Sequence, residues 1–239
     1  MDPGVLLMLW LFFVNKFTVE VLMSSAPSVS RSRFEFTTSQ CSLMMAVFGI
    51  LVLPTNAALS YSVTRREMLR QRLEQSSLGF HDAFDNGDGE TTLILQLMMG
   101  TCVALALVLD VDDIGLKLHT DRYIFAVMLG FVLMQAQEGV LLSKLSKIIA
   151  FRSPESAKGT CNSGLLATEA GTIGRALGDA FLTFVASMCS HESGAHWHLH
   201  QSENIESRIG LVNAYFGPNL ILLLFSLWMV MRNKAAAAV

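Results

Sequence analysis

Charged side chains lie inside long apolar segments of this sequence. Lys16 and Glu20 stand four residues apart in one segment, Arg175 and Asp179 repeat that spacing in another, and Glu138 lies in a third. A charge at the centre of a membrane-spanning helix costs roughly 3 kcal/mol, so such residues face a bundle interior or a water-filled path and find partners there. The chemistry that these residues predict is the binding of a charged solute within a membrane.

Amide and carboxylate side chains accompany these charges. Gln135 shares a helix face with Glu138, Asn15 adjoins Lys16, and Glu169 lies two turns before Arg175. Two cationic sites and several amides in one bundle suit a hydrated oxyanion, although the spacing does not select which one. The alternative is that the pairs neutralise one another locally and only fix helix packing. For Arg175 with Asp179 that alternative stays open.

Small residues recur along the segment CNSGLLATEAGTIGRALGDAF. Gly171, Gly174 and Gly178 recur at three- and four-residue intervals, a pattern that lets a neighbouring backbone approach closely. Pro54 in LVLPTNAAL and Pro218 in YFGPNL lie inside two other apolar segments, where proline frees a carbonyl and kinks a helix. These residues predict tight helix packing or gating.

The composition is that of an integral membrane protein. The 239 residues are 52% hydrophobic and only 15% charged, with a mean hydropathy of +0.46. A net charge of -3 with scattered basic residues excludes a nucleic-acid interface. No nucleophile lies beside a base, and no cofactor or metal motif is present. FDNGDGE lacks the acidic first and twelfth ligands of a calcium loop. We therefore expect neither an enzyme nor a cofactor.

Six apolar segments are long enough to cross a bilayer as helices. Six such runs between polar loops argue against a soluble bundle and predict an all-α membrane protein with six transmembrane helices. They run over Val5–Met23, Cys41–Val63, Thr91–Leu109, Tyr123–Leu142, Asn162–Cys189 and Ile209–Met231.

Basic residues predict the orientation. The loops after the second and fourth segments, with the carboxy-terminal tail, hold about twice as many Lys and Arg residues as the opposite loops. We therefore expect both termini on the cytoplasmic side, a cytoplasmic loop over 64–90, and a His-rich lumenal loop over 190–208. The start lacks the positive charge of a cleaved signal peptide.

Several stretches resemble one transporter family. EGVLLSKLSKII and KGTCNSGLLATEAGTIGRALGDAF resemble the tenth and eleventh helices of the SPX-type major facilitator proteins, the vacuolar phosphate transporters of plants and algae. FEFTTSQCSLMMAVFGILVLPTN is similar to the start of their eighth helix, and the first segment, with Lys16 and Glu20, to their seventh. The resemblance extends over most of the chain, and LLATEAGT is its most specific part.

The resemblance implies that residues 1–239 form the carboxy-terminal half, helices 7–12, of a phosphate transporter. Lys16, Glu138, Glu169 and Arg175 match charged positions of the family, and Lys16 and Arg175 would face the phosphate. The implied partners are inorganic phosphate or a related anion, the lipid bilayer of a vacuole or other endomembrane, and an amino-terminal six-helix half. The sequence contains no SPX domain. A non-transporting accessory or truncated membrane protein is the alternative.

Overall fold

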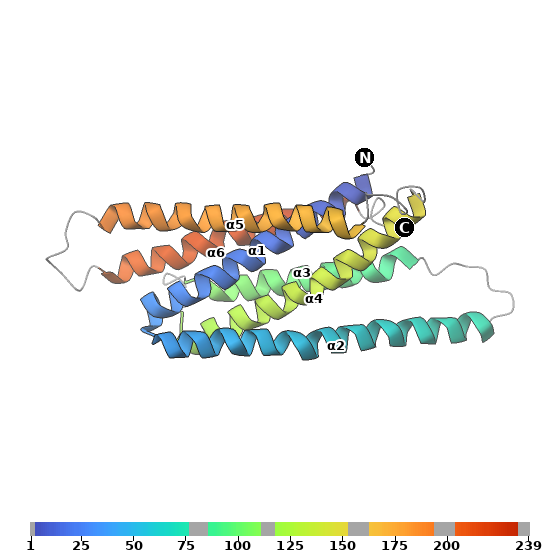
Figure 1. Cartoon of the computed structure of the whole chain (residues 1–239), viewed down its shortest axis with the longest axis horizontal. Helices are drawn as coiled ribbons and strands as arrows, with labels where there is room; N and C mark the ends of the chain where they lie inside the picture. The colour runs from blue at the N-terminus through green and yellow to red at the C-terminus, as the bar shows by residue number, and fades with distance from the viewer. Residues whose placement is uncertain (1–2, 77–85, 111–117, 153–162, 194–203, 234–239) are drawn as a thin grey trace.

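The computed structural model describes residues 3–76, 86–110, 118–152, 163–193 and 204–233, and these form six α-helices (Figure 1). The helices are α1 (Pro3–Phe34), α2 (Thr38–Ser76), α3 (Asn86–Val108), α4 (Thr120–Arg152), α5 (Ser163–Ser193) and α6 (Asn204–Arg232).

Five of these helices contain a stretch that is long and apolar enough to cross a membrane: Pro3–Phe34, Thr38–Ala58, Gly89–Val108, Thr120–Ala150 and Gly210–Arg232. The chain is therefore an all-α membrane protein. Helix α5 has 31 residues, but Glu169, Arg175 and Asp179 interrupt its apolar character. A sixth crossing over α5 stays a prediction.

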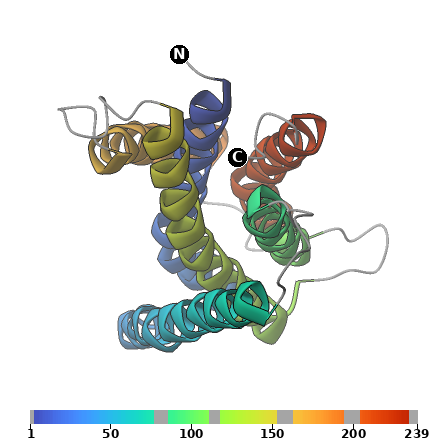
Figure 2. The ribbon, with the colours of Figure 1, turned by 90° about the vertical axis from the view of Figure 1, so that its right-hand side faces the viewer.

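Helix α1 is the centre of the bundle. It packs most extensively against α5 and also contacts α4 and α6, while α3 packs against α4 and α6. Trp10 Nε1 donates to Ser226 Oγ at 3.1 Å, which ties α1 to α6. The start of α1 and the end of α6 lie at the same end of the bundle (Figure 1). Helix α2 packs mainly on α4 and lies at the edge of the bundle (Figure 2).

Apolar side chains fill the bundle and also cover its outside. Leu22, Tyr123 and Phe216 belong to one buried cluster, and Leu11 and Leu141 belong to a second one. Apolar residues of α2 are exposed instead: Leu43, Val47, Ile50 and Leu53. Exposed apolar side chains of this density suit contact with lipid, as expected for a helix at the edge of a membrane bundle.

A buried carboxylate joins three helices at one end of the bundle. Asp110, which is 1% exposed, accepts from Arg33 Nη2 at 2.7 Å and from the Leu118 amide at 2.9 Å. The Asn213 side chain bonds both the amide and the carbonyl of Asp110, at 2.9 and 2.7 Å. These bonds fasten the end of α3 to α1 and α6. Arg33 is thus part of a buried pair, whereas its sequence position indicated a loop charge.

Two expected loops are partly helical. Within 64–90, α2 continues to Ser76 and α3 begins at Asn86, so part of this segment is helical, and its place on the cytoplasmic side stays a prediction. The stretch TRREMLRQRLEQ consists largely of good helix formers, so the helix extends beyond its apolar part. Within 190–208, α5 runs to Ser193 and α6 begins at Asn204. Residues 194–203, with three of the four histidines of this segment, lie outside the described residues.

A tight connection links α1 to α2. Glu35 has a left-handed backbone with φ of 57°, and the Phe36 amide donates to Ser30 O at 3.1 Å. Helix α2 then starts with a reciprocal cap: the Gln40 amide donates to Thr37 Oγ1 at 3.3 Å, and the Thr37 amide donates to Gln40 Oε1 at 2.8 Å.

Glycine at position 35 is expected to stabilise the protein. A side chain in the left-handed region costs about 1 kcal/mol that glycine does not incur, so Glu35→Gly should raise the free energy of unfolding by about that amount. Denaturant titration of the purified protein in detergent micelles measures this change. Glu35→Ala keeps the Cβ and should give no gain, and an equal gain in both variants would contradict the explanation.

Candidate functional site

Lys16 and Glu138 form an ion pair between α1 and α4. Lys16 Nζ lies 2.5 Å from Glu138 Oε2, and the two side chains are 9% and 29% exposed. The ammonium also lies 5.7 Å from the ring centroid of Phe12. Both residues are candidates from the sequence, in which the four-residue spacing also allows Lys16 to face Glu20. Glu20 instead accepts a hydrogen bond from Ser24 Oγ at 2.8 Å.

The glycine face of α5 holds the stem of Lys16. A Cβ on Gly171 would lie 3.3 Å from Lys16 Cγ, and a Cβ on Gly174 would lie 3.1 Å from Lys16 Cβ and 2.6 Å from the Phe13 carbonyl oxygen. A Cβ on Gly178 would lie 2.9 Å from Glu20 Cβ. The absence of these carbons lets α5 approach α1 closely. The Lys16 stem is packed against α5 while its charge reaches α4.

Three buried amide side chains have polar atoms without a hydrogen-bond partner in the described part of the chain. These atoms are both Asn15 side-chain atoms, Gln137 Oε1 and Asn219 Nδ2. Asn219 Oδ1 is satisfied, since Thr18 Oγ1 donates to it at 2.8 Å. Each unpaired polar atom costs about 1–3 kcal/mol when it is buried. Such atoms call for water or a polar solute as a partner.

Helix register brings two of these amides to the level of the ion pair. A Cβ on Gly130 of α4 would touch Leu22 of α1 at 3.3 Å. Helices α1 and α4 run antiparallel. Gln137 lies seven residues, about two turns, after Gly130, and Asn15 lies seven residues before Leu22, so Gln137 and Asn15 are at the same level of the bundle. These residues are the direct neighbours of Glu138 and Lys16 in sequence. Buried amides and an ion pair therefore occur at one level of the bundle.

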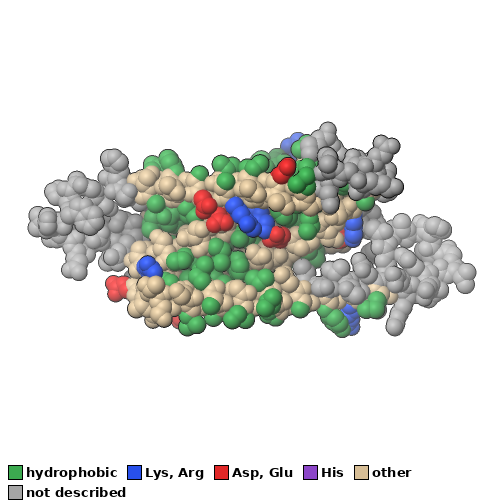
Figure 3. Space-filling model, viewed as in Figure 1, with side chains coloured by type: hydrophobic (Ala, Val, Ile, Leu, Met, Phe, Trp, Pro, Cys, Tyr) green, Lys and Arg blue, Asp and Glu red, His purple; other side chains and the backbone are tan. Residues whose placement is uncertain are grey.

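The remaining polar candidates lie elsewhere. Gln135 is half-buried on α4. Glu169, Arg175 and Asp179 are exposed on α5, and within the described residues no ion pair joins Arg175 to Asp179. Figure 3 shows acidic and basic side chains gathered midway along the face formed by α5 and the neighbouring α1. The structure thus groups Lys16, Glu138 and Asn15, and it places Arg175 on a surface.

The two prolines lie within continuous helices. Pro54 is exposed in α2, and Pro218 is exposed in α6 beside the buried Asn219. Proline at 218 cannot donate to the carbonyl four residues earlier, at Ala214. A gating role for either proline stays a prediction.

Sequence reasoning missed several polar residues of the interior. Gln137 and Thr18 lie in mid-segment beside the chosen residues, and their polar type in an apolar run was the available signal. Lys144 was assigned to a loop, but it lies in α4, is 1% exposed and donates to Thr91 Oγ1 at 2.5 Å. Nearby, Lys147 pairs with Glu90 at 2.5 Å. Helix α4 continues to Arg152, beyond the predicted segment Tyr123–Leu142, so Lys144 is buried in the bundle, whereas Lys147 is exposed.

Lys16 can exchange Glu138 for an anion as its partner. An ammonium has three N–H donors and no acceptor, so an anion that enters beside Glu138 competes for the same donors. Unpaired amides at the same level supply further donors from Asn15 and acceptors for water or a protonated oxyanion. This arrangement is suited to reversible anion binding and contains no group placed for covalent chemistry among the described residues.

Comparison with known proteins gives one group of relatives. The chain is 28% identical over 183 residues to an SPX domain-containing membrane protein of Oryza sativa subsp. indica and to one of Arabidopsis thaliana. The chain is similar to plant SPX domain-containing membrane proteins. The match covers 77% of this chain and 22% of each relative, so the chain spans less than a quarter of their length. No family model and no solved structure matches it.

Proposed function

We propose that this chain is one six-helix half of a major facilitator transporter for inorganic phosphate or a similar small oxyanion. The Lys16–Glu138 pair is the observation that carries the proposal, because a buried, exchangeable cation lies beside unsatisfied amides inside a membrane bundle. The resemblance to vacuolar phosphate transporters supplies the substrate class and the vacuole-type membrane. By this proposal both termini are cytoplasmic.

A second helical half completes the transporter in this proposal. In major facilitators the solute binds between two six-helix halves near the bilayer midplane, and the halves rock about it. Helix α5 carries Glu169, Arg175 and Asp179 on an exposed face, and charges at that depth are costly against lipid. A partner half would cover them and would bring a polar surface to Arg175. The α5 face is thus assigned to the interface.

Uptake of labelled phosphate into vesicles tests the function. We expect uptake by vesicles that contain this chain together with the amino-terminal six-helix half of a plant relative, and background uptake by vesicles that contain either half alone. Arg65→Gln removes an exposed positive charge of α2 outside the proposed site, and it should leave uptake unchanged. Background uptake in every combination, with both halves inserted, would favour an accessory role for the chain.

A further inference from the structure

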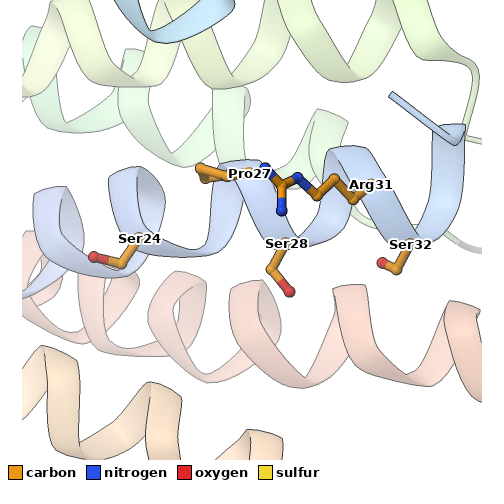
Figure 4. A pocket seen from close by; sticks show the side chains of 5 residues that line it. All are labelled: Ser24, Pro27, Ser28, Arg31 and Ser32. Atoms are coloured by element: carbon orange, nitrogen blue, oxygen red, sulfur yellow. The ribbon is translucent and has the colours of Figure 1, made fainter. Parts of the chain in front are cut away.

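An open pocket lies beside the second half of α1. It has a volume of about 600 Å³ and is lined by Ser24, Pro27, Ser28, Arg31 and Ser32. Figure 4 shows the three serines along one side of the helix, with the Arg31 side chain extending back toward Pro27 and Ser28. Hydroxyl and guanidinium groups are good donors to oxyanions, and a guanidinium offers five N–H groups in a planar fork. None of these five residues was a candidate from the sequence.

The donors of the pocket are largely unused. Arg31 gives one hydrogen bond, from Nη2 to Thr38 Oγ1 at 3.1 Å. The Ser28 hydroxyl makes no hydrogen bond within the described residues, whereas Ser24 donates to Glu20 at 2.8 Å and Ser32 to the Val29 carbonyl at 3.4 Å. Ser28 and Arg31 are thus the groups that remain available for a ligand.

The pocket and Lys16 lie on the same helix. Lys16, Glu20, Ser24 and Ser28 follow one another at four-residue intervals along α1, so each lies about one turn from the next. The hydrogen bond between Ser24 and Glu20 joins two members of this row. With a rise of 1.5 Å per residue, Arg31 lies about 22 Å along the helix from Lys16.

The pocket lies beside the start of the apolar stretch of α2. The apolar stretch of α2 begins at Thr38, to which Arg31 donates, and Cys41 Sγ lies 3.9 Å from the Pro27 carbonyl oxygen. This part of α1 is therefore level with the first turn of the apolar stretch of α2. Lys16 lies several helical turns away along α1. Polar residues of α1 thus occur at intervals between this pocket and Lys16.

We propose that Ser28 and Arg31 form an outer binding station for the oxyanion at this end of α1. The proposal rests on the proposed function for the identity of the anion. Arg31 attracts the anion there, and Ser28 and Ser24 replace part of its hydration shell. Glu20 lies between the two cations, and its negative charge separates the outer station from Lys16.

Thiol modification in membranes tests the station without a transport assay. Ser28→Cys is introduced together with Cys161→Ser and Cys189→Ser, whereas Cys41 and Cys102 are buried and stay in place. We expect rapid reaction with an anionic methanethiosulfonate, and inorganic phosphate should slow it. Adding Arg31→Gln should slow the anionic reagent about tenfold while a neutral methanethiosulfonate reacts at an unchanged rate. Leu53→Cys, at an exposed apolar position of α2, should stay unreactive.

Uptake measurements test the binding station separately from the transporter assignment. Arg31→Gln should raise the phosphate concentration for half-maximal uptake about tenfold with a similar maximal rate, and Arg31→Lys should retain most of the affinity. If phosphate protects the thiol of the Ser28→Cys variant but no variant or partner gives uptake, the station stands and the transporter assignment fails. If that thiol is unreactive, or neither phosphate nor Arg31→Gln alters the anionic rate, the station is refuted whatever the uptake result.

Discussion

Replacing Lys16 by glutamine is expected to abolish most phosphate uptake, whereas replacing Glu138 by glutamine is expected to spare it. A hydrogen bond to a charged group contributes about 1.5–3 kcal/mol, so Lys16→Gln should lower uptake at low phosphate about tenfold to a hundredfold. Glu138→Gln leaves the ammonium in place and removes its competitor, so phosphate affinity should be kept or raised. Initial rates of labelled uptake over a range of phosphate concentrations measure both effects.

The asymmetry between the two variants distinguishes binding from a structural pair. Lys16 Nζ lies 2.5 Å from Glu138 Oε2, and Glu138 is the more exposed partner at 29%. If the pair only fixed helix packing, removal of either charge would leave the other unpaired and would be harmful in both cases. Equal losses in the single variants, with recovery in Lys16→Gln combined with Glu138→Gln, would therefore contradict the binding role. Protein inserted per vesicle is the control for folding.

The helical class and five membrane crossings could be predicted because they depend on local composition. Runs of about 20 apolar residues indicate helices that satisfy their own backbone in lipid, and five of the six predicted runs have this character in the structure. Boundaries were harder to predict. Helix formers continue α2 to Ser76, and α4 carries Lys144 and Lys147 beyond the predicted segment, which ended at Leu142. Apolarity marks the bilayer core, whereas helix propensity decides where the helix ends.

The sequence indicated which residues belong to the site, but it did not indicate which of them pair with each other. Lys16 and Glu138 were selected because charges inside apolar runs are costly. Their pairing joins residues that are 122 positions apart in sequence, and it depends on how α1 crosses α4. The four-residue spacing allowed Glu20 as a partner, but Glu20 packs against Gly178 and accepts a hydrogen bond from Ser24. Spacing in the sequence identifies neighbours on one helix, but it does not predict contacts with another helix.

Alanine at position 174 is expected to separate α1 from α5 and to disturb the Lys16 site. The added Cβ would lie 2.6 Å from the Phe13 carbonyl oxygen, 3.1 Å from Lys16 Cβ and 3.2 Å from the Phe17 amide nitrogen. The first contact is with main chain, which moves only with its helix. Overpacking of this kind costs about 1–3 kcal/mol, so Gly174→Ala should lower the free energy of unfolding by about that amount.

Gly164→Ala is the matched control on the same helix, because a Cβ there meets nothing within 4 Å. Alanine is favoured over glycine in a helix by about 1 kcal/mol, so this control should be neutral or stabilising. Denaturant titration in micelles measures both variants. Disulfide trapping between Phe17→Cys and Phe181→Cys, whose ring centroids lie 5.7 Å apart, reports the separation of α1 and α5, and it should slow in Gly174→Ala alone. If both alanine variants behave alike, the close contact at Gly174 does not hold the two helices together. A selective effect at 174 would instead show that glycine on the α1 side of α5 is needed to leave room for the Lys16 stem.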